Sequence, residues 1–314
     1  MTLAEAIVYF SNESNAFAFI RSMRWEGSVA VCPACSSKES YPLAGRLWKC
    51  KECGKKFSVR VGTIFEDSPL SLGKWMSAFW LIVNAKNGIS SYEIHRAIGV
   101  TQKTAWFMLH RIRMAIQNGS IEKLKGIVES DECFIGPNAD FMHKSVKKKK
   151  GIAPGYTAKT MVWGLLERSQ EKGKSKVRAK VLKNSKKPTL LAGIHANVEA
   201  GSELHTDSWV GYKKLNANVV HKFVDHAAEY VRDNVHTNGL ENFWCLLKRT
   251  IKGTYVSVNA EHLFRYLDEQ CFRFNERKDN DQGRFLKAVA GMVGKRLTYA
   301  ALTGRSDSLP GTAA

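Results

Sequence analysis

Three acidic residues in distinctive settings could carry out phosphodiester transfer. Asp131 lies in VESDECFIG, Asp207 in ELHTDSWVGY and Glu241 in HTNGLENFWCLLKRTIKGTY. Carboxylates from three separate elements can converge on two Mg²⁺ ions, and two metals about 3.5–4 Å apart stabilise both the attacking and the leaving oxygen. The chain contains 29 Asp and Glu residues, so the triple needs support from its surroundings.

The segments around these acids predict how each side chain is held. The apolar–polar alternation of residues 126–136 is typical of a strand, with Asp131 near its middle or end. Glu132 follows Asp131 and would point to the opposite face of that strand, which predicts a structural or peripheral role. The sequence from residue 238 to 253 reads as an amphipathic helix. At spacings of three, four and three, one face of this helix holds Asn238, Glu241, Cys245 and Lys248.

Four of the seven cysteines have the spacing of a metal site. They form two pairs, CPAC at residues 32–35 and CKEC at residues 50–53, and the segment YPLAGRLWKC between them resembles a β-hairpin. Four thiolates at about 2.3 Å satisfy tetrahedral Zn²⁺. The predicted ligands of a structural zinc are Cys32, Cys35, Cys50 and Cys53. The other three cysteines are scattered, which indicates a reducing compartment rather than disulfides.

Residues 67–120 are rich in helix signals. A first helix is expected from about Ser71 to Ala85, and a second begins with a serine cap and stops at Gly99. A third opens with Thr101 as its cap. Helix, short glycine-containing turn and helix is the helix-turn-helix pattern, whose second helix enters the major groove of DNA. The alternative is an ordinary helical hairpin in a core.

The last of these helices would then supply the DNA contacts. The side chains expected at base edges are Gln102, Lys103 and Thr104. Those expected near backbone phosphates are Arg111 and Arg113. Those expected to face the core are Trp106, Leu109 and Ile112.

Residues 126–300 alternate strands and helices. Strands are expected at 127–135, 160–169 and 176–182, then a helix near 188–198, a strand reaching Asp207 and the helix from residue 238. Three antiparallel strands, a helix, a parallel strand and a later helix match the ribonuclease-H-like order. We therefore expect an α/β ribonuclease-H-like mixed sheet with flanking helices, preceded by a zinc ribbon and a helix-turn-helix. The expected boundaries are 1–66, 67–120 and 126–300, with a disordered tail at 301–314.

The charge of the chain predicts a polyanionic partner. The 314 residues carry a net charge of +19, with a pI near 9.6. In the first third, the longest charge-free apolar stretch is 11 residues, whereas a membrane-spanning helix needs about 20. Met1 to Phe17 contain an early Glu5 and no basic segment, which disfavours a secretion signal. A cytoplasmic protein, at the nucleoid when bound to DNA, is therefore expected.

The positive charge is concentrated in one segment. Residues 141–190 contain 15 Lys and Arg against 2 Glu. This segment includes the run Lys147, Lys148, Lys149 and Lys150. Such runs are usually solvated loops, but the position beside the first candidate carboxylate favours contact with the DNA backbone.

The sequence resembles bacterial insertion-sequence transposases that join an N-terminal zinc ribbon to a DDE catalytic domain of the retroviral-integrase type. The resemblance covers nearly the whole chain and rests on the cysteine module, VESDECFIG, HTDSWVGYKKL, HKFVDH and VHTNGLENFWCLLKRTIKGTY. It implies that Asp131, Asp207 and Glu241 bind catalytic Mg²⁺ and that Lys248 contacts the DNA end. Relatives differ in whether Glu or Asn is the third catalytic residue, and Asn238 and Asn242 flank Glu241, so that assignment stays open.

The resemblance implies a DNA transposase that binds the terminal inverted repeats of its element and catalyses Mg²⁺-dependent cleavage and strand transfer. Its partner would be double-stranded DNA. A homo-oligomer is expected because two element ends must be held together. Two alternatives remain: a Mg²⁺-dependent endonuclease without strand transfer, and a DNA-binding regulator derived from a transposase.

Overall fold

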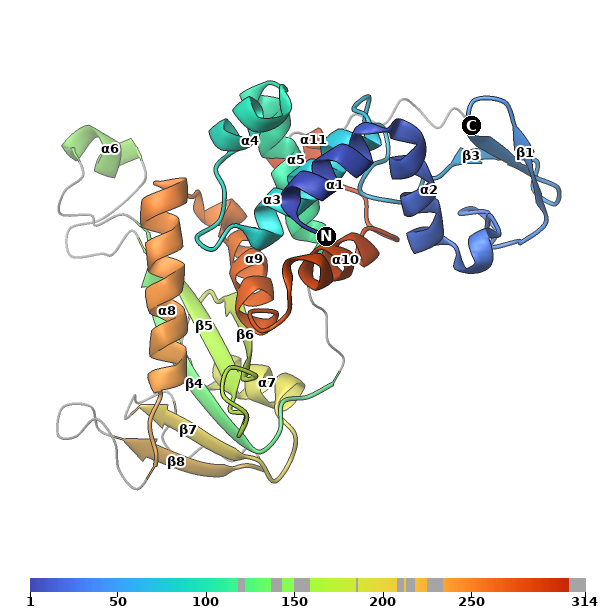
Figure 1. Ribbon diagram of the computed structural model, residues 1–314. Helices are drawn as coiled ribbons and strands as arrows, with labels where there is room; N and C mark the ends of the chain where they lie inside the picture. Colours follow the sequence, from blue (N-terminus) through green and yellow to red (C-terminus); the bar gives the residue numbers. More distant parts are fainter. Residues whose placement is uncertain are drawn as a thin grey trace, which may run out of the picture. The chain divides into compact units, whose positions relative to one another are not determined.

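The chain divides into two compact units in the computed structural model (Figure 1). Unit 1 comprises Met1–Gln117 and Asp279–Ala314, and unit 2 comprises Asn118–Lys278. The structure describes residues 1–117, 122–136, 143–149, 159–184, 186–207, 212, 218–224 and 234–304. In this described part, no helix is long and apolar enough to cross a membrane.

Unit 1 begins with two helices and a small sheet. Helix α1 (Leu3–Ser11) starts with a capping box between Thr2 and Glu5, and α2 (Glu13–Arg24) follows. After a 3₁₀ turn, η1 (Glu26–Ser28), come the antiparallel strands β1 (Ser40–Leu43), β2 (Leu47–Cys50) and β3 (Lys56–Ser58). The predicted hairpin is confirmed. Its buried side is aromatic, because Trp48 lies opposite Phe57 and both contact Trp25.

The helical region of unit 1 has the predicted bounds. Helix α3 spans Leu72–Asn84, α4 spans Ser91–Ile98 and α5 spans Gln102–Ala115. The side chains of Ser90 and Thr101 cap α4 and α5 at their N-termini. Gly99 ends α4 with a φ of 61°, a conformation that glycine adopts without steric cost.

The C-terminal segment belongs to unit 1, although the sequence suggested one domain over residues 126–300. In α10 (Asp281–Ala290), Phe285 is fully buried against the rings of Phe10, Phe19 and Trp80. The disordered tail predicted from residue 301 is wrong for its first residues, which belong to α11 (Tyr299–Thr303). Thr298 caps that helix and Leu302 is buried. Residues 305–314 lie outside the described part of the chain.

Unit 2 is built on a five-stranded mixed sheet with the order β6-β5-β4-β7-β8. Strands β4 (Ile127–Ile135), β5 (Thr160–Glu167) and β6 (Lys176–Val181) are antiparallel. Strand β7 (Glu203–Asp207) runs parallel to β4, and β8 (Val220–Val224) runs parallel to β7. This confirms the predicted ribonuclease-H-like order and adds β8, which the sequence patterns did not reveal. Strand β4 lies at the centre, and most of its side chains are buried or half-buried, with Phe134 the exposed exception.

Helices cover both faces of this sheet (Figure 1). On one face pack α8 (Asn238–Thr250), its π-helical continuation η4 (Ile251–Tyr255), and α9 (Leu263–Asn275) after the 3₁₀ turn η5 (Ala260–His262). On the other packs α7 (Lys187–Asn197). The short helix α6 (Lys144–Lys149) lies between β4 and β5 in the chain.

Helix α8 is held by an apolar stripe. Leu240, Phe243 and Leu247 are each 0% exposed. Fully burying such a side chain contributes roughly 1.5–3 kcal/mol. Close approach to the sheet depends on Gly164 of β5, where a Cβ atom would lie 2.7 Å from the Trp244 ring. The sheet therefore fixes the helix that carries Glu241.

Candidate active site and zinc centre

The parallel pairing of β4 and β7 brings the two candidate aspartates together. Glu129 lies beside His205, and continuing this register by two residues places Asp131 beside Asp207. Directly paired residues of neighbouring strands project from the same face of a sheet. For Asp131 this is the α8 face, because the Nε1–H of Trp244 donates a hydrogen bond to Asp131 Oδ2 at 2.9 Å.

Glu241 enters the same region from the first turn of α8. Its Oε1 accepts a hydrogen bond from the Thr237 hydroxyl at 3.2 Å. Burial raises the pKa of Asp131 to about 6, and repulsion from Asp207 and Glu241 adds to the rise. Hydrogen bonds from the Glu132 amide and from Trp244 act in the opposite direction. Asp131 is therefore close enough to Asp207 and to Glu241 for their charges to raise its pKa, and a cation would relieve that repulsion.

These carboxylates do not form a compact ligand cluster. Within the described ranges, the only group of three or more His, Cys, Asp or Glu residues with ligand atoms all within 4.8 Å consists of the four zinc-ribbon cysteines. The donor chemistry still fits Mg²⁺, because hard divalent cations prefer anionic oxygens. Asn238 and Asn242 carry no charge, so this repulsion does not distinguish Glu241 from them, and Glu241 as the third group stays a prediction.

Lys248 lies over the same face of β4. Burial raises the pKa of the Cys133 thiol, while a hydrogen bond and the positive charge of Lys248 act to lower it. The Lys248 ammonium group is thus close to Cys133. Since Cys133 follows Asp131 by two residues on one strand, both side chains project from the same face. Lys248 therefore offers a cation two turns along α8 from Glu241.

Glu132 projects from the opposite face, as predicted, but it is not peripheral. Its Oε1 accepts a hydrogen bond from the Tyr212 hydroxyl at 2.5 Å. Tyr212 also contacts Ser130 at 2.9 Å and accepts from Trp163 Nε1 at 3.2 Å. Burial raises the pKa of Glu132 to about 7, and Asp131 and Asp207 add repulsion. Glu132 thus belongs to a buried polar network on the α7 side of the sheet.

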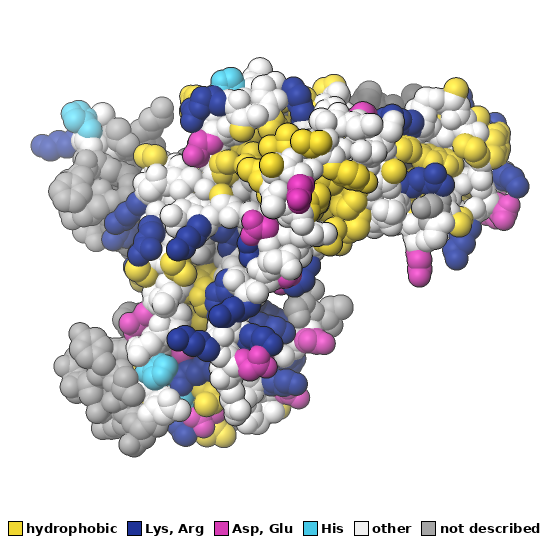
Figure 2. Space-filling view, in the orientation of Figure 1, with side chains coloured by type: hydrophobic (Ala, Val, Ile, Leu, Met, Phe, Trp, Pro, Cys, Tyr) yellow, Lys and Arg dark blue, Asp and Glu magenta, His cyan; other side chains and the backbone are white. Residues whose placement is uncertain are grey.

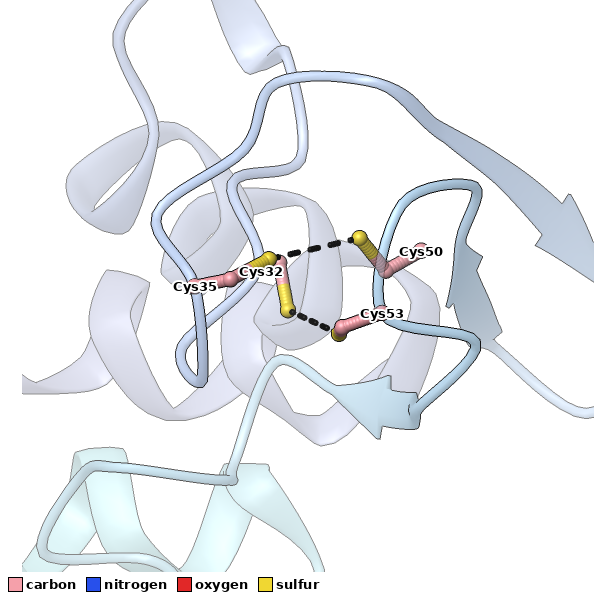
Figure 3. Close-up of side chains that lie close together, drawn as sticks. All are labelled: Cys32, Cys35, Cys50 and Cys53. Carbon is pink, nitrogen blue, oxygen red and sulfur yellow. Dashed lines mark hydrogen bonds between the residues drawn. The ribbon is translucent and has the colours of Figure 1, made fainter.

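The four predicted zinc ligands converge in unit 1 (Figure 3). Their sulfurs lie within 4.8 Å of one another, with Cys32 Sγ and Cys53 Sγ 3.6 Å apart and Cys35 Sγ and Cys50 Sγ also 3.6 Å apart. Tetrahedral Zn²⁺ with bonds of about 2.3 Å requires sulfurs roughly 3.8 Å apart. The cluster is therefore consistent with a structural zinc.

The start of α5 is only partly free to reach DNA. Gln102 Nε2 donates to Ser91 Oγ at 2.9 Å, so its amide joins α5 to α4. The Thr104 hydroxyl shares a 2.8 Å hydrogen bond with that of Thr101. Lys103 is exposed, and its ammonium lies 4.7 Å from the centroid of the Tyr299 ring. Lys103 is thus the best placed of the three predicted base-contacting residues.

The prediction that Arg111 and Arg113 contact phosphates is wrong for this structure. Arg111 is 5% exposed and Arg113 is 1% exposed. Arg111 donates hydrogen bonds of 2.9–3.0 Å to the carbonyls of Ile64, Glu66 and Leu297. The C-terminal segment covers this face of α5, so Arg111 joins α5 to other parts of unit 1. Of the three residues expected in the core, Leu109 and Ile112 are buried and Trp106 is half-buried.

The predicted lysine run is described only in part. Lys147 and Lys148 lie on α6, half-buried and exposed respectively. Lys149 ends the helix, and Lys150 lies outside the described residues. Figure 2 shows Lys and Arg side chains spread over the face in view, with fewer Asp and Glu among them. The face in view therefore suits a polyanion.

The sequence patterns missed three side chains that hold or adjoin the candidate site: Trp244, Tyr212 and Glu129. Trp244 lies three residues after Glu241, and helical spacing alone could have placed it beside the acids. Tyr212 and Glu129 carry no such signal, because their partners are remote in the chain: Glu132 for Tyr212 and Leu240 for Glu129.

Unit 2 thus combines a five-stranded mixed sheet with acidic residues on β4, β7 and α8, and unit 1 carries the four-cysteine ribbon. Comparison with known proteins gives the family. Residues 123–275, almost all of unit 2, match the ISXO2-like transposase domain, and residues 11–56 match the transposase zinc-ribbon domain. The chain belongs to the IS1595 family of ISXO2-like transposases.

A relative described as an uncharacterized protein in transposable element ISH50 supports this assignment. It comes from Halobacterium salinarum and is 25% identical over 272 residues, which cover 82% of this chain and 89% of the relative. Because that organism is an archaeon, the resemblance to bacterial elements does not fix the source of this chain. Membership of the family implies DNA transposition and a transposase catalytic activity.

Proposed function

We propose that this protein binds the terminal inverted repeats of its own element, cleaves DNA at those ends and joins the ends to target DNA. The observation that carries the proposal is geometric. The parallel register of β4 and β7 leads to Asp131 beside Asp207, and α8, which carries Glu241, packs over the same face through the hydrogen bond from Trp244 to Asp131. Neighbouring carboxylates that share a partly buried site repel one another, and a cation relieves that cost. When bound, Mg²⁺ would activate the attacking oxygen and stabilise the leaving one.

Each side chain has a defined role in this proposal. Asp131, Asp207 and Glu241 would hold the metal, and Trp244 would orient the Asp131 carboxylate through its hydrogen bond. Lys248 would contact a phosphate of the DNA end. Water first attacks the phosphodiester at the element end and leaves a 3′-hydroxyl. That hydroxyl then attacks a target phosphodiester, joins the element to the target and releases a target 3′-hydroxyl.

The partners follow from this chemistry. Double-stranded DNA is bound twice, once as element end and once as target. Two ends must be joined in one event, so we propose a homo-oligomer. A duplex carrying the inverted repeats that flank the gene, incubated with target plasmid and Mg²⁺, tests the proposal. Joined products support it, and cleavage without joining identifies an endonuclease instead.

We further propose that Cys32, Cys35, Cys50 and Cys53 bind one structural Zn²⁺ per chain. Structural zinc contributes folding free energy directly. Cys50→Ser is therefore expected to lose zinc, unfold the ribbon and weaken end binding, while unit 2 stays folded. The matched control is Cys245→Ser, an exposed cysteine outside the cluster, which should keep its zinc. Metal analysis under reducing conditions that finds no zinc in the unaltered protein would refute the site.

We also propose that α5 reads the repeat sequence and that the lysines of α6 contact backbone phosphates. Lys103→Ala is expected to weaken binding to the repeat by about 1–3 kcal/mol, with little effect on random DNA, because a base contact is lost. Gln102 and Thr104 would add smaller contributions, since their side chains already bond within the protein.

Replacing Lys147 and Lys148 together by Ala should weaken binding to every duplex. Each lost phosphate contact should make the plot of the logarithm of the DNA-binding constant against the logarithm of the salt concentration less steep by about 0.9. Titrations at several salt concentrations with repeat and random duplexes measure both effects. Equal losses on both duplexes for the Lys103 variant would show that α5 does not read sequence.

A further inference from the structure

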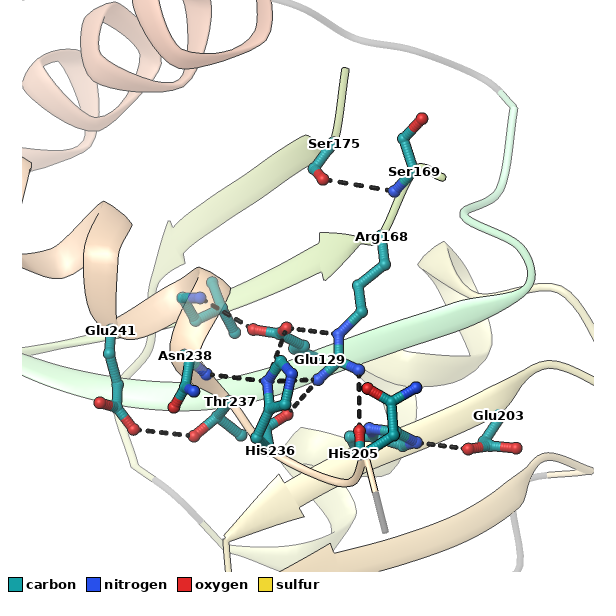
Figure 4. Close-up of polar contacts among 12 residues, drawn as sticks. Glu129, Arg168, Ser169, Ser175, Glu203, His205, His236, Thr237, Asn238 and Glu241 are labelled. Atoms are coloured by element: carbon teal, nitrogen blue, oxygen red, sulfur yellow. Dashed lines mark hydrogen bonds and ion pairs between the residues drawn. The ribbon is translucent and has the colours of Figure 1, made fainter. Parts of the chain in front are cut away.

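Glu129 is a buried carboxylate that the proposed chemistry does not use. Glu129 is 1% exposed. It lies two positions before Asp131 on β4, so both side chains project from the same face of the sheet. A buried charge is stable only when it is paired and hydrogen-bonded. Both conditions are met here. Arg168 Nε donates to Glu129 Oε1 at 2.6 Å, and the backbone N–H of Leu240 donates to Oε2 at 2.9 Å (Figure 4).

The second of these hydrogen bonds caps the helix that carries Glu241. The local cap residue of α8, Thr237, makes no side-chain cap hydrogen bond. Glu129 of β4 takes that place, so its negative charge lies at the positive end of the helix dipole. The contact is close: a Cβ atom on Gly239 would lie 2.9 Å from Glu129 Oε2. The start of α8 is thus fixed directly to β4.

Arg168 holds the segment that leads into α8. Its Nη1 donates to the Asn234 carbonyl at 3.0 Å, and its Nη2 donates to the His236 carbonyl at 2.6 Å (Figure 4). The His236 ring lies against the same guanidinium, with Nδ1 2.6 Å from Nη2. Burial and the charge of Arg168 both lower the pKa of His236, so its neutral form accepts this hydrogen bond. One guanidinium therefore joins β4 to the chain entering α8.

We infer that Glu129 and Arg168 are a positioning pair that sets the spacing between Asp131 and Glu241. Asp131 lies two residues beyond Glu129 on β4, and Glu241 follows Leu240 directly on α8. Any shift of the helix start relative to the strand therefore moves Glu241 relative to Asp131. The inference rests on the proposed function, in which these two carboxylates hold one metal site. Neither Glu129 nor Arg168 needs to touch the metal.

Terbium luminescence tests this inference without measuring DNA cleavage. Terbium occupies oxygen-rich Mg²⁺ sites, and Trp244 Nε1 lies 2.9 Å from Asp131 Oδ2, so this tryptophan can sensitise an ion held there. The zinc-loaded full chain is titrated, with Asp131→Asn as the blank. Arg168→Lys keeps the positive charge but loses the two guanidinium NH₂ groups that donate to the carbonyls of Asn234 and His236. We expect this variant to raise the terbium concentration at half-maximal luminescence, the terbium midpoint, about tenfold. That is the effect typical of groups that orient metal ligands.

A matched control separates positioning from general stability. Arg273 and Glu269 of α9 form another buried pair in unit 2, with Arg273 Nη2 also donating to Gln270 Oε1 at 2.9 Å. Arg273→Lys should lower the melting temperature and leave the terbium midpoint unchanged. Should Arg168→Lys fail to fold, Glu129→Gln is the second variant. Its amide oxygen can still accept from the Leu240 N–H, which favours folding, but its neutral side chain no longer forms the ion pair with Arg168. The same rise in midpoint is expected.

The outcomes are distinct. A wild-type midpoint in a folded Arg168 or Glu129 variant overturns the positioning role and leaves the metal site intact. An equal rise in Arg273→Lys also overturns it, because loss of stability would then explain the effect. An unchanged signal in Asp131→Asn contradicts the proposed metal site itself.

Discussion

Asp131→Asn, Asp207→Asn and Glu241→Gln should each abolish strand cleavage while repeat binding stays near wild type. Each substitution keeps the size of the side chain and removes the negative charge that a hard cation requires. Binding should survive because we propose that it rests on the ribbon, α5 and the basic surface. It can even improve, since a charge that repels phosphate is lost. Cleavage of a labelled repeat duplex in Mg²⁺ and a gel-shift titration of the same duplex measure the two properties.

Neighbouring residues supply the controls for this result. Glu132→Gln should retain most activity, because its side chain leaves β4 on the opposite face and bonds Tyr212. Asn238→Ala and Asn242→Ala test the third position. If Glu241→Gln still cleaves and one of these asparagine variants does not, the third ligand is misassigned and the mechanism stands. Wild-type cleavage by both aspartate variants would rule out the catalytic assignment.

Gly164→Ala should damage both stability and catalysis, although Gly164, which pairs with Asp131 across the sheet, supplies no side chain to the site. The new Cβ would lie 2.7 Å from the Trp244 ring and 2.9 Å from Leu240 Cδ2, so α8 must move away from the sheet. Overpacking of this kind costs typically about 1–3 kcal/mol of unfolding free energy. Because Trp244 orients Asp131 and α8 carries Glu241, misplacement of about 1 Å would lower cleavage on the order of 100-fold. Denaturant unfolding and the cleavage assay measure the two losses.

Gly253→Ala is the matched control for this prediction. A Cβ atom at Gly253 would meet no heavy atom within 4 Å, and the residue has no positive φ. Its unfolding free energy should change by less than about 0.5 kcal/mol. Equal destabilisation by the two variants would show that helix docking against Gly164 does not limit stability.

Elements with strong local signals could be predicted from the sequence. Strand β4 follows from its apolar–polar alternation, and α8 follows from its 3.6-residue period. Ser90, Gly99 and Thr101 gave the ends of α4 and the start of α5, because caps are local chemistry. The cysteine module was equally clear, since its four ligands occupy two short turns.

Features that depend on remote packing could not be predicted. Arg111 reads as a surface cation on α5, and only the return of the C-terminal segment, with Leu297, buries it. Strand β8 has a weak pattern and gains its place by pairing with β7. Likewise, Glu129 is one of several acids in VESDE, and its role as the cap of α8 depends on a partner 111 residues away. Such contacts between residues far apart in the chain cannot be predicted from local sequence patterns.

Strand transfer with a blocked end tests the central claim most directly. Two pre-cleaved repeat duplexes, one ending in a 3′-hydroxyl and one in a 3′-dideoxynucleotide, are incubated with the protein, Mg²⁺ and target plasmid. The duplexes should bind equally, and only the 3′-hydroxyl end should become joined to the plasmid, because that hydroxyl is the attacking group. Joining of neither end by folded protein that binds both, or of both ends alike, would contradict the claim that this chain is a DNA strand transferase.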